Sequence, residues 1–150
     1  MRNLWMIAFA LIISGCTPNA NTRSFVATPV PDEIRTVIYS VETSAGSNTW
    51  KLTNDDLRIR HTVKSGNGTI VSDWIKVIKP NDYNWVVYNL EQAKFTKVKS
   101  LSRRVPPRQL EKLTVITQSD VYTYTQNNAA RFPNGFQKVI NVIPGLANAR

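Results

Sequence analysis

Only one side chain in this sequence is suited to general acid–base catalysis near neutral pH, and that is His61. It lies in the segment Leu57-Arg58-Ile59-Arg60-His61-Thr62-Val63, where apolar and polar residues alternate with a period of two. The alternation predicts a half-buried strand with His61 on the apolar side. No serine or aspartate nearby is placed to suggest a catalytic triad. We therefore expect a structural or surface histidine and a protein that is not an enzyme.

Metal and cofactor chemistry is also not indicated by the sequence. A metal site needs several His, Cys or carboxylate ligands, and the chain offers too few at suitable spacings. The pair Asp55-Asp56 could hold a hard cation, but a turn after Asn54 explains it more simply. The sequence contains no phosphate-binding glycine loop. We expect no metal and no cofactor.

The single cysteine, Cys16, follows a segment with the three parts of a secretory signal. These parts are a positive charge at Arg2, an apolar run over residues 4–13, and the small residues Ser14-Gly15. The apolar run is shorter than the roughly 20 residues that a membrane-spanning helix needs. The sequence Ile13-Ser14-Gly15-Cys16 resembles the lipobox of bacterial lipoproteins. The resemblance implies cleavage before Cys16 and acylation of this residue, with two or more chains for stable anchoring.

The residue after Cys16 is Thr17 rather than Asp. In Gram-negative lipoproteins, an Asp directly after the cysteine looks like a signal that retains the protein in the inner membrane. This chain lacks that Asp. The resemblance therefore implies a lipid-anchored protein on the periplasmic side of the outer membrane. Its partners would be the membrane itself and an envelope protein or anionic lipid, whereas nucleic acid is not expected there.

The segment after the cysteine is expected to be a flexible tether, because residues 17–34 hold three prolines and many small polar residues. This gives four expected parts of the chain. They are a signal peptide over residues 1–15, a lipidated cysteine and tether over 16–34, a single domain over 35–145 and a tail over 146–150.

Positive charge is concentrated in one segment. Removing Arg2 with the signal leaves 18 Lys and Arg against 10 Asp and Glu, a net charge of +8. Residues 94–112 alone hold seven basic residues and one acidic residue. Such a field attracts anionic partners, although a solvated loop is the simpler explanation. The candidate contacts for an anion or partner are Lys97, Lys99, Arg103, Arg104 and Arg108.

The remaining pattern predicts alternating blocks of strands and helices. Strands are expected over residues 36–42, 48–53, 57–63 and 69–78, and a hairpin over 113–118 and 121–125. One helix should begin at a cap on Asn81 or Asp82 with Asn89 on its outer face, and a second should follow Asn134 and stop at Pro144-Gly145. Residues 99–112 are expected to form a loop. The blocks predict an α+β fold, a small antiparallel sheet of about five or six strands with two helices on one face.

The aromatic residues allow two interpretations. Trp50 and Tyr83 are expected in the core, whereas Trp85 lies one position off the apolar stripe of its helix and could be exposed. The pattern of Tyr39-Ser40, Ala45-Gly46 and Trp50-Lys51-Leu52, followed by a helix, Phe95, a strand pair and a terminal helix, resembles the emfourin-type small protease inhibitors. That family tends to have Gly-Gly where this chain has Val41-Glu42.

Two functions remain open at this level. The first is a non-catalytic, membrane-anchored envelope lipoprotein that acts as an accessory or binding subunit. The alternative, which the second resemblance implies, is an inhibitor of a protease or other hydrolase that presents a rigid exposed loop at residues 44–47 or 103–108.

Overall fold

A computed structural model of the chain describes residues 33–98, 109–127 and 132–148. The chain divides into two units, Met1–Val30 and Pro31–Arg150, and every described residue belongs to the second. The expected signal peptide, Cys16 and residues 17–32 of the expected tether lie outside the described residues. The elements are β1 (Ile34–Thr43), β2 (Gly46–Thr53), β3 (Arg58–Ser65), β4 (Ile70–Val77), α1 (Pro80–Gln92), the 3-10 helix η1 (Phe95–Lys97), β5 (Gln109–Thr117), β6 (Val121–Asn127) and α2 (Asn134–Asn148).

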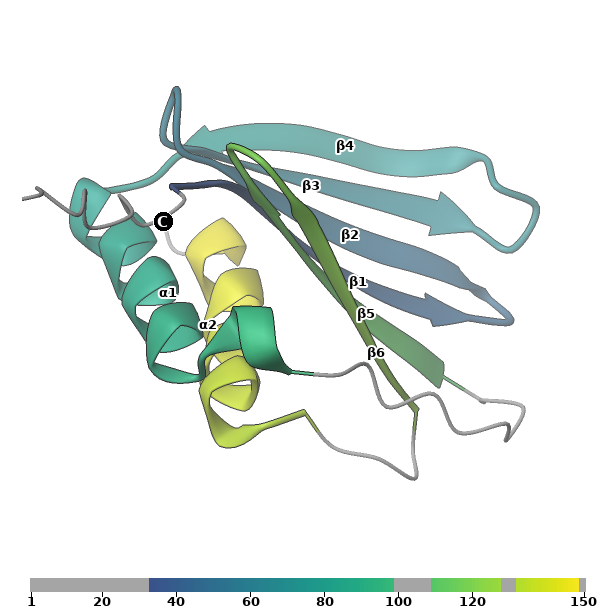
Figure 1. Cartoon of the computed structure of the whole chain (residues 1–150). Coiled ribbons are helices and arrows are strands. Elements are labelled where there is room, and N and C mark those ends of the chain that lie inside the picture. The colour runs from purple at the N-terminus through teal and green to yellow at the C-terminus, as the bar shows by residue number, and fades with distance from the viewer. Residues whose placement is uncertain (1–32, 99–108, 128–131, 149–150) are drawn as a thin grey trace, which may run out of the picture. The chain divides into compact units, whose positions relative to one another are not determined.

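The strands form one antiparallel sheet in the order β4-β3-β2-β1-β5-β6. Both α-helices lie on the same side of this sheet (Figure 1). The predicted α+β class is therefore confirmed, with six strands in the sheet. Strands β1 to β4 follow one another as hairpins, and β5 returns to pair with the free edge of β1.

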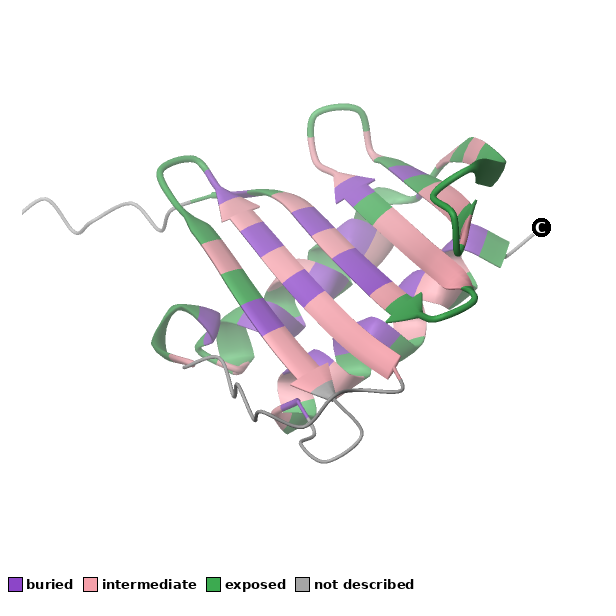
Figure 2. Cartoon of the chain, turned by 90° about the vertical axis from the view of Figure 1, so that its right-hand side faces the viewer, coloured by how far each residue is buried: buried purple, intermediate pink, exposed green. Residues whose placement is uncertain are grey.

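The core lies between the helices and one face of the sheet. Val37, Leu52 and Ile59 are neighbours across β1, β2 and β3, and all three are fully buried. Phe136 from α2 and Val86 from α1 complete the same core. Along the strands, bands of buried residues alternate with more exposed ones (Figure 2). This is the period-two pattern expected when one face of a sheet is covered and the other meets water.

Helix α1 begins earlier than predicted and without a side-chain cap. Its first residue is Pro80, which precedes the expected caps Asn81 and Asp82. Proline suits this position because the missing N–H would have no partner inside the helix. The prediction for Asn89 was also wrong, since this residue is buried and its side-chain amide donates to the carbonyl of Trp85 at 2.8 Å. Trp85 itself is 39% exposed, as its position suggested.

Helix α2 does not stop at Pro144-Gly145, and residues 146–148 are therefore not a tail. The helix continues past Pro144 because its last turn is held by tertiary contacts. Ala147 is buried in the core, and the carbonyl of Leu146 accepts a hydrogen bond from Lys76 Nζ on β4 at 3.3 Å. These contacts outweigh the local preference of proline to end a helix.

Two strand boundaries also differ from the predictions, and pairing explains both. Ile34 is buried and begins β1, so this residue belongs to the folded domain and not to the expected tether. Residues 109–112, which were expected in a loop, belong to β5 because they pair with residues 40–43 of β1. The rest of the expected loop, residues 99–108, lies outside the described residues. Strand pairing thus extends β5 beyond the apolar segment that marked it in the sequence.

The close packing of the two helices leads to a stability prediction at Gly135. A Cβ atom there would lie 2.5 Å from Ala93 Cβ and 2.9 Å from the Asn89 carbonyl oxygen. Gly135→Ala should therefore lower the free energy of unfolding by about 1–3 kcal/mol, as overpacking usually does. Equilibrium urea unfolding measures this change.

The matched control is Gly145→Ala in the same helix, where nothing lies within 4 Å of the added atom. This variant should gain up to about 1 kcal/mol from helix propensity. An equal gain in both variants would contradict the close approach of α1 and α2.

Candidate binding surface on the open face of the sheet

The face of the sheet opposite the helices carries charged residues and threonines. On β2 and β3, the residues that alternate with the buried Leu52 and Ile59 include Lys51, Arg58 and Arg60, and these three are exposed. Lys51 and Arg60 are direct register partners. We call this surface the open face. Neither of the two α-helices covers it, because both lie on the other side of the sheet (Figure 1).

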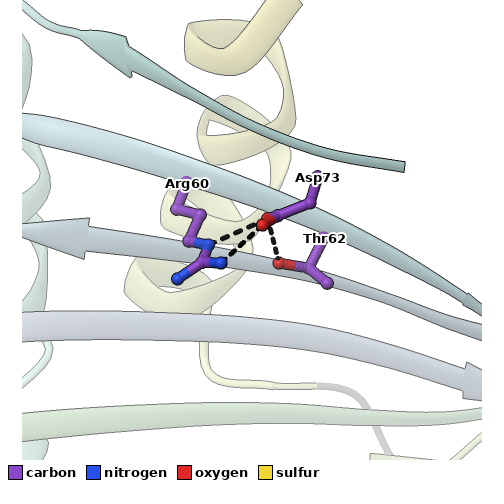
Figure 3. A network of polar contacts seen from close by, with 3 residues as sticks. All are labelled: Arg60, Thr62 and Asp73. Carbon is purple, nitrogen blue, oxygen red and sulfur yellow. Dashed lines mark hydrogen bonds and ion pairs between the residues drawn. The ribbon is translucent and has the colours of Figure 1, made fainter. Parts of the chain in front are cut away.

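A polar network on the open face joins β3 to the edge strand β4. Arg60 donates from Nε to Asp73 Oδ1 at 2.8 Å and from Nη2 to Asp73 Oδ2 at 2.5 Å. Thr62 Oγ1 donates to the same carboxylate at 2.9 Å. The three side chains converge on this side of the sheet, with α2 beyond it (Figure 3). Hydrogen bonds from Arg60 and Thr62 lower the pKa of Asp73 to about 2.

Next to this network lies an open hollow of about 160 Å³. Its lining residues are Lys51, Thr53, Asp56, Arg58, Arg60 and Ile75. Arg58 pairs with Asp56 at 3.5 Å, and Lys51 has no carboxylate within ion-pair distance among the described residues. The hollow therefore holds three cationic groups and one carboxylate, and it is suited to a small anion.

His61 lies on the other face of β3, in a row of aromatic rings that crosses the sheet. Its ring stacks on Trp50 with centroids 4.8 Å apart and meets the edge of Trp74 at 5.4 Å. Trp50 in turn stacks on Tyr39. Register places these four residues side by side on β1 to β4. The ring faces of Trp50 and His61 are used in packing, so these two rings do not offer a flat platform to a ligand.

The surroundings of His61 fit a structural role. Its Nε2 lies 3.3 Å from Asn48 Oδ1, and burial lowers its pKa. The Glu111 carboxylate on β5 belongs to a separate set of contacts, in which it accepts hydrogen bonds from Tyr39, Gln109 and Gln126. Burial raises the pKa of Tyr39, and the nearby Glu111 carboxylate raises it further. No contact between His61 and a nucleophile or carboxylate is present among the described residues.

The residues predicted to bind an anion or partner are mostly not described. Lys97 is exposed at the end of η1. Cys16, Lys99, Arg103, Arg104 and Arg108 lie outside the described residues.

The structure instead points to cations that the sequence analysis passed over. Arg58 and Arg60 were noted only as the polar half of an alternating strand. Their alternation with Ile59 and His61 placed them on the opposite face, but nothing local in the sequence put Lys51 beside Arg60. The pairing of β2 with β3 decides this contact.

The turn interpretation of Asp55-Asp56 fits the contacts in the structure. Asp56 accepts a hydrogen bond from Thr53 Oγ1 at 2.6 Å, which closes the turn between β2 and β3. Within residues 33–98, 109–127 and 132–148, no group of three or more His, Cys, Asp or Glu side chains could hold a metal ion. Over the same ranges, no helix is long and apolar enough to cross a membrane.

No protein-family model matches the chain, and no curated protein matches it in sequence.

The lowered pKa of His61 predicts a pH dependence of stability. Below about pH 6.5 the unfolded chain binds more protons than the folded protein, because burial favours the neutral imidazole. The free energy of unfolding should therefore fall as the pH drops from about 7 to 5. In His61→Phe, which can keep the ring packing, this part of the dependence should be absent.

The chain has one histidine, so its NMR titration is unambiguous. A pKa at or above 6.5 for His61 in the folded protein would contradict an uncharged, packed imidazole.

The carboxylate of Asp73 gives a second titration test. With Arg60→Gln, the pKa of Asp73 should rise from about 2 toward its ordinary value of 3.8. Thr62→Val should raise the pKa less, because it removes one neutral donor. The ion pair stabilises the fold above about pH 4, and this contribution is lost as the pH falls toward 2. Carboxyl-carbon NMR measures the pKa directly, and a wild-type value near 3.8 would exclude the network.

Proposed function

We propose that the chain is a bacterial lipoprotein, anchored through acylated Cys16, whose domain acts as a non-catalytic binding subunit at the periplasmic side of the outer membrane. The observation that carries this proposal is the arrangement of Arg2, ten apolar residues and Ile13-Ser14-Gly15-Cys16. A single cysteine at this position has no disulfide partner in the chain, which fits a role in lipid attachment.

The described domain supports binding better than catalysis. Its one histidine is packed between tryptophans, and its carboxylates Asp56, Asp73 and Glu111 are held by hydrogen bonds or ion pairs on separate parts of the sheet. The open face, by contrast, presents cations and exposed apolar residues to solvent. Such a surface is suited to an anionic or macromolecular partner.

A second candidate function is inhibition of a protease or other hydrolase. The turn between β1 and β2 favours it, since an inhibitory loop must be exposed and rigid. Ser44 and Ala45 are exposed, and Thr43 Oγ1 is hydrogen-bonded across the turn to the Gly46 carbonyl and the Ala45 amide, both at 3.2 Å. A Cβ at Gly46 would lie 2.0 Å from the Lys64 carbonyl oxygen, so only glycine fits here.

The lipoprotein proposal is tested by the chemistry of residue 16. Mass spectrometry of the membrane fraction should find a mature N-terminal peptide that begins with an acylated Cys16. Cys16→Ser should abolish both the acylation and the cleavage before residue 16, whereas Ser14→Ala keeps a small residue in the motif and should be processed normally. A wild-type protein that is cleaved elsewhere, or that carries a free thiol, would refute the proposal.

The two functions are separated by their partners. Cross-linking the full lipoprotein in intact cells should recover one dominant envelope protein if the domain is an accessory subunit. An inhibitor should instead reduce the activity of a metalloprotease or a lysozyme in a purified assay. Loss of that inhibition in Gly46→Val, which disrupts the turn, would favour the second candidate.

A further inference from the structure

The hollow on the open face joins a cationic pocket to an exposed apolar edge. Arg60 and Ile75 are register partners, as are Arg58 and Val77, so the cations of β3 and the apolar residues of the edge strand β4 lie side by side. Ile75 is 55% exposed and Val77 is 66% exposed. An edge strand that exposes apolar side chains is unusual, because most edge strands are protected by charge or by a covering segment.

The cations are arranged so that one anion can contact several of them. The contacts with Asp73 orient the guanidinium of Arg60 through Nε and Nη2, and its Nη1 makes no hydrogen bond to another of the described residues. Lys51 lies directly opposite Arg60 on β2 and has no carboxylate partner among the described residues. Arg58, two residues along β3, also lines the hollow, where it pairs with Asp56. A phosphate group bridging these donors would form the charge-assisted bonds that arginine and lysine favour.

The hollow lies near the start of the domain, and this position favours the phosphate of a membrane lipid as its ligand. Glu33, the first described residue, accepts a hydrogen bond from the side chain of Asn54 at 2.6 Å, and the amide of Asn54 donates to the Arg35 carbonyl. Asn54 begins the turn that leads directly into Arg58. The chain that continues back to Cys16 therefore starts at the end of the sheet that carries Arg58 and Val77, and only 16 residues separate Cys16 from Glu33.

We propose that this hollow binds the phosphate of an anionic phospholipid headgroup, with Ile75 and Val77 against the apolar boundary of the bilayer. The open face would then dock onto the same membrane that holds the anchor, an inference that rests on the proposed lipoprotein function. A surface that combines basic and apolar side chains is the combination that binds a bilayer interface. A free phosphate, a second copy of the chain or a protein strand would not require all of these features in one place.

The test uses the full lipoprotein with acylated Cys16, reconstituted in lipid nanodiscs. One set of discs contains only phosphatidylcholine, and the other contains phosphatidylcholine mixed with phosphatidylglycerol. Hydrogen–deuterium exchange followed by mass spectrometry reports on the backbone of β4. We expect slower exchange over residues 70–77 in the anionic discs than in the neutral discs.

Three substitutions remove the cations of the hollow, and three others serve as a matched control. Lys51→Gln, Arg58→Gln and Arg60→Gln together should abolish the difference between the discs. The control combines Lys79→Gln, Lys94→Gln and Lys138→Gln, which remove the same charge from exposed positions outside the sheet. This control variant should still show slower exchange of β4 in the anionic discs than in the neutral discs. Since the Arg60 variant also breaks an ion pair, Ile75→Thr with Val77→Thr provides a second variant that keeps every charge, and it should weaken the protection.

Each outcome decides between occupants of the surface. Headgroup binding at this site would be overturned if β4 exchanged at the same rate in both kinds of disc. It would also be overturned if the two triple variants lost the protection of β4 to the same extent. Protection that depends on protein concentration rather than on lipid would identify a second copy as the occupant. If inorganic phosphate changes the NMR chemical shifts of Lys51, Arg58 and Arg60 while β4 is not protected in the discs, the ligand of the hollow is a free anion. Co-flotation of the protein with the discs is measured separately, so loss of anchoring is distinguished from loss of docking.

Discussion

The two helices cover only one face of the six-stranded sheet, and this one-sided burial determines where every strand side chain can point. β1 is the reference for the whole arrangement because it pairs with β2 on one edge and β5 on the other. Val37 on β1 is fully buried, and so are its register partners Leu52 and Val115. A shift of one residue in either pairing would turn such residues to the solvent side, since side chains alternate along a strand. Burial of the apolar row therefore fixes the register of the neighbouring strands.

The same constraint produces the open face. Once Leu52 and Ile59 point toward the helices, the residues between them must point the other way, and these include Lys51 and Arg60. No helix or loop of the described part of the chain covers them. The cations are thus gathered by strand pairing and not by any charged run in the sequence. Paired with Asp73, Arg60 has a defined orientation, which a solvated arginine on a loop would lack.

Residue types that suggest chemistry are used here for packing. His61 is enclosed by Trp50 and Trp74, and its lowered pKa follows from burial. Tyr124 shows the same principle at the other edge of the sheet, where burial raises the pKa of its hydroxyl to about 12 and the hydroxyl donates to the Phe95 carbonyl. In both cases a polar side chain is packed against neighbouring rings and has a partner for a polar atom, at Asn48 for His61 and at Phe95 for Tyr124. Such groups specify how the elements pack and do not form a reactive site.

The sequence alone determined the class of the fold and most of its elements. Period-two alternation located β3, the residue pattern indicated the other strands, and Tyr83 of α1 was expected in the core and is buried. Boundaries were less certain where local preference and tertiary contact disagreed. Pro144 was expected to end α2, but burial of Ala147 keeps the last turn helical.

Only the tertiary structure decided which polar residues lie together. The pattern of residues 57–63 showed that Arg58 and Arg60 share a face, because that relation depends on a single strand. Their proximity to Lys51 and Ile75 depends on the register of three strands, and no local pattern encodes this. The expected export signal and the expected acylation of Cys16 differ from this surface, because both depend only on residues that are contiguous in the sequence. The sequence therefore predicts where the chain is anchored, whereas the surface that the domain presents there follows only from how the strands pair.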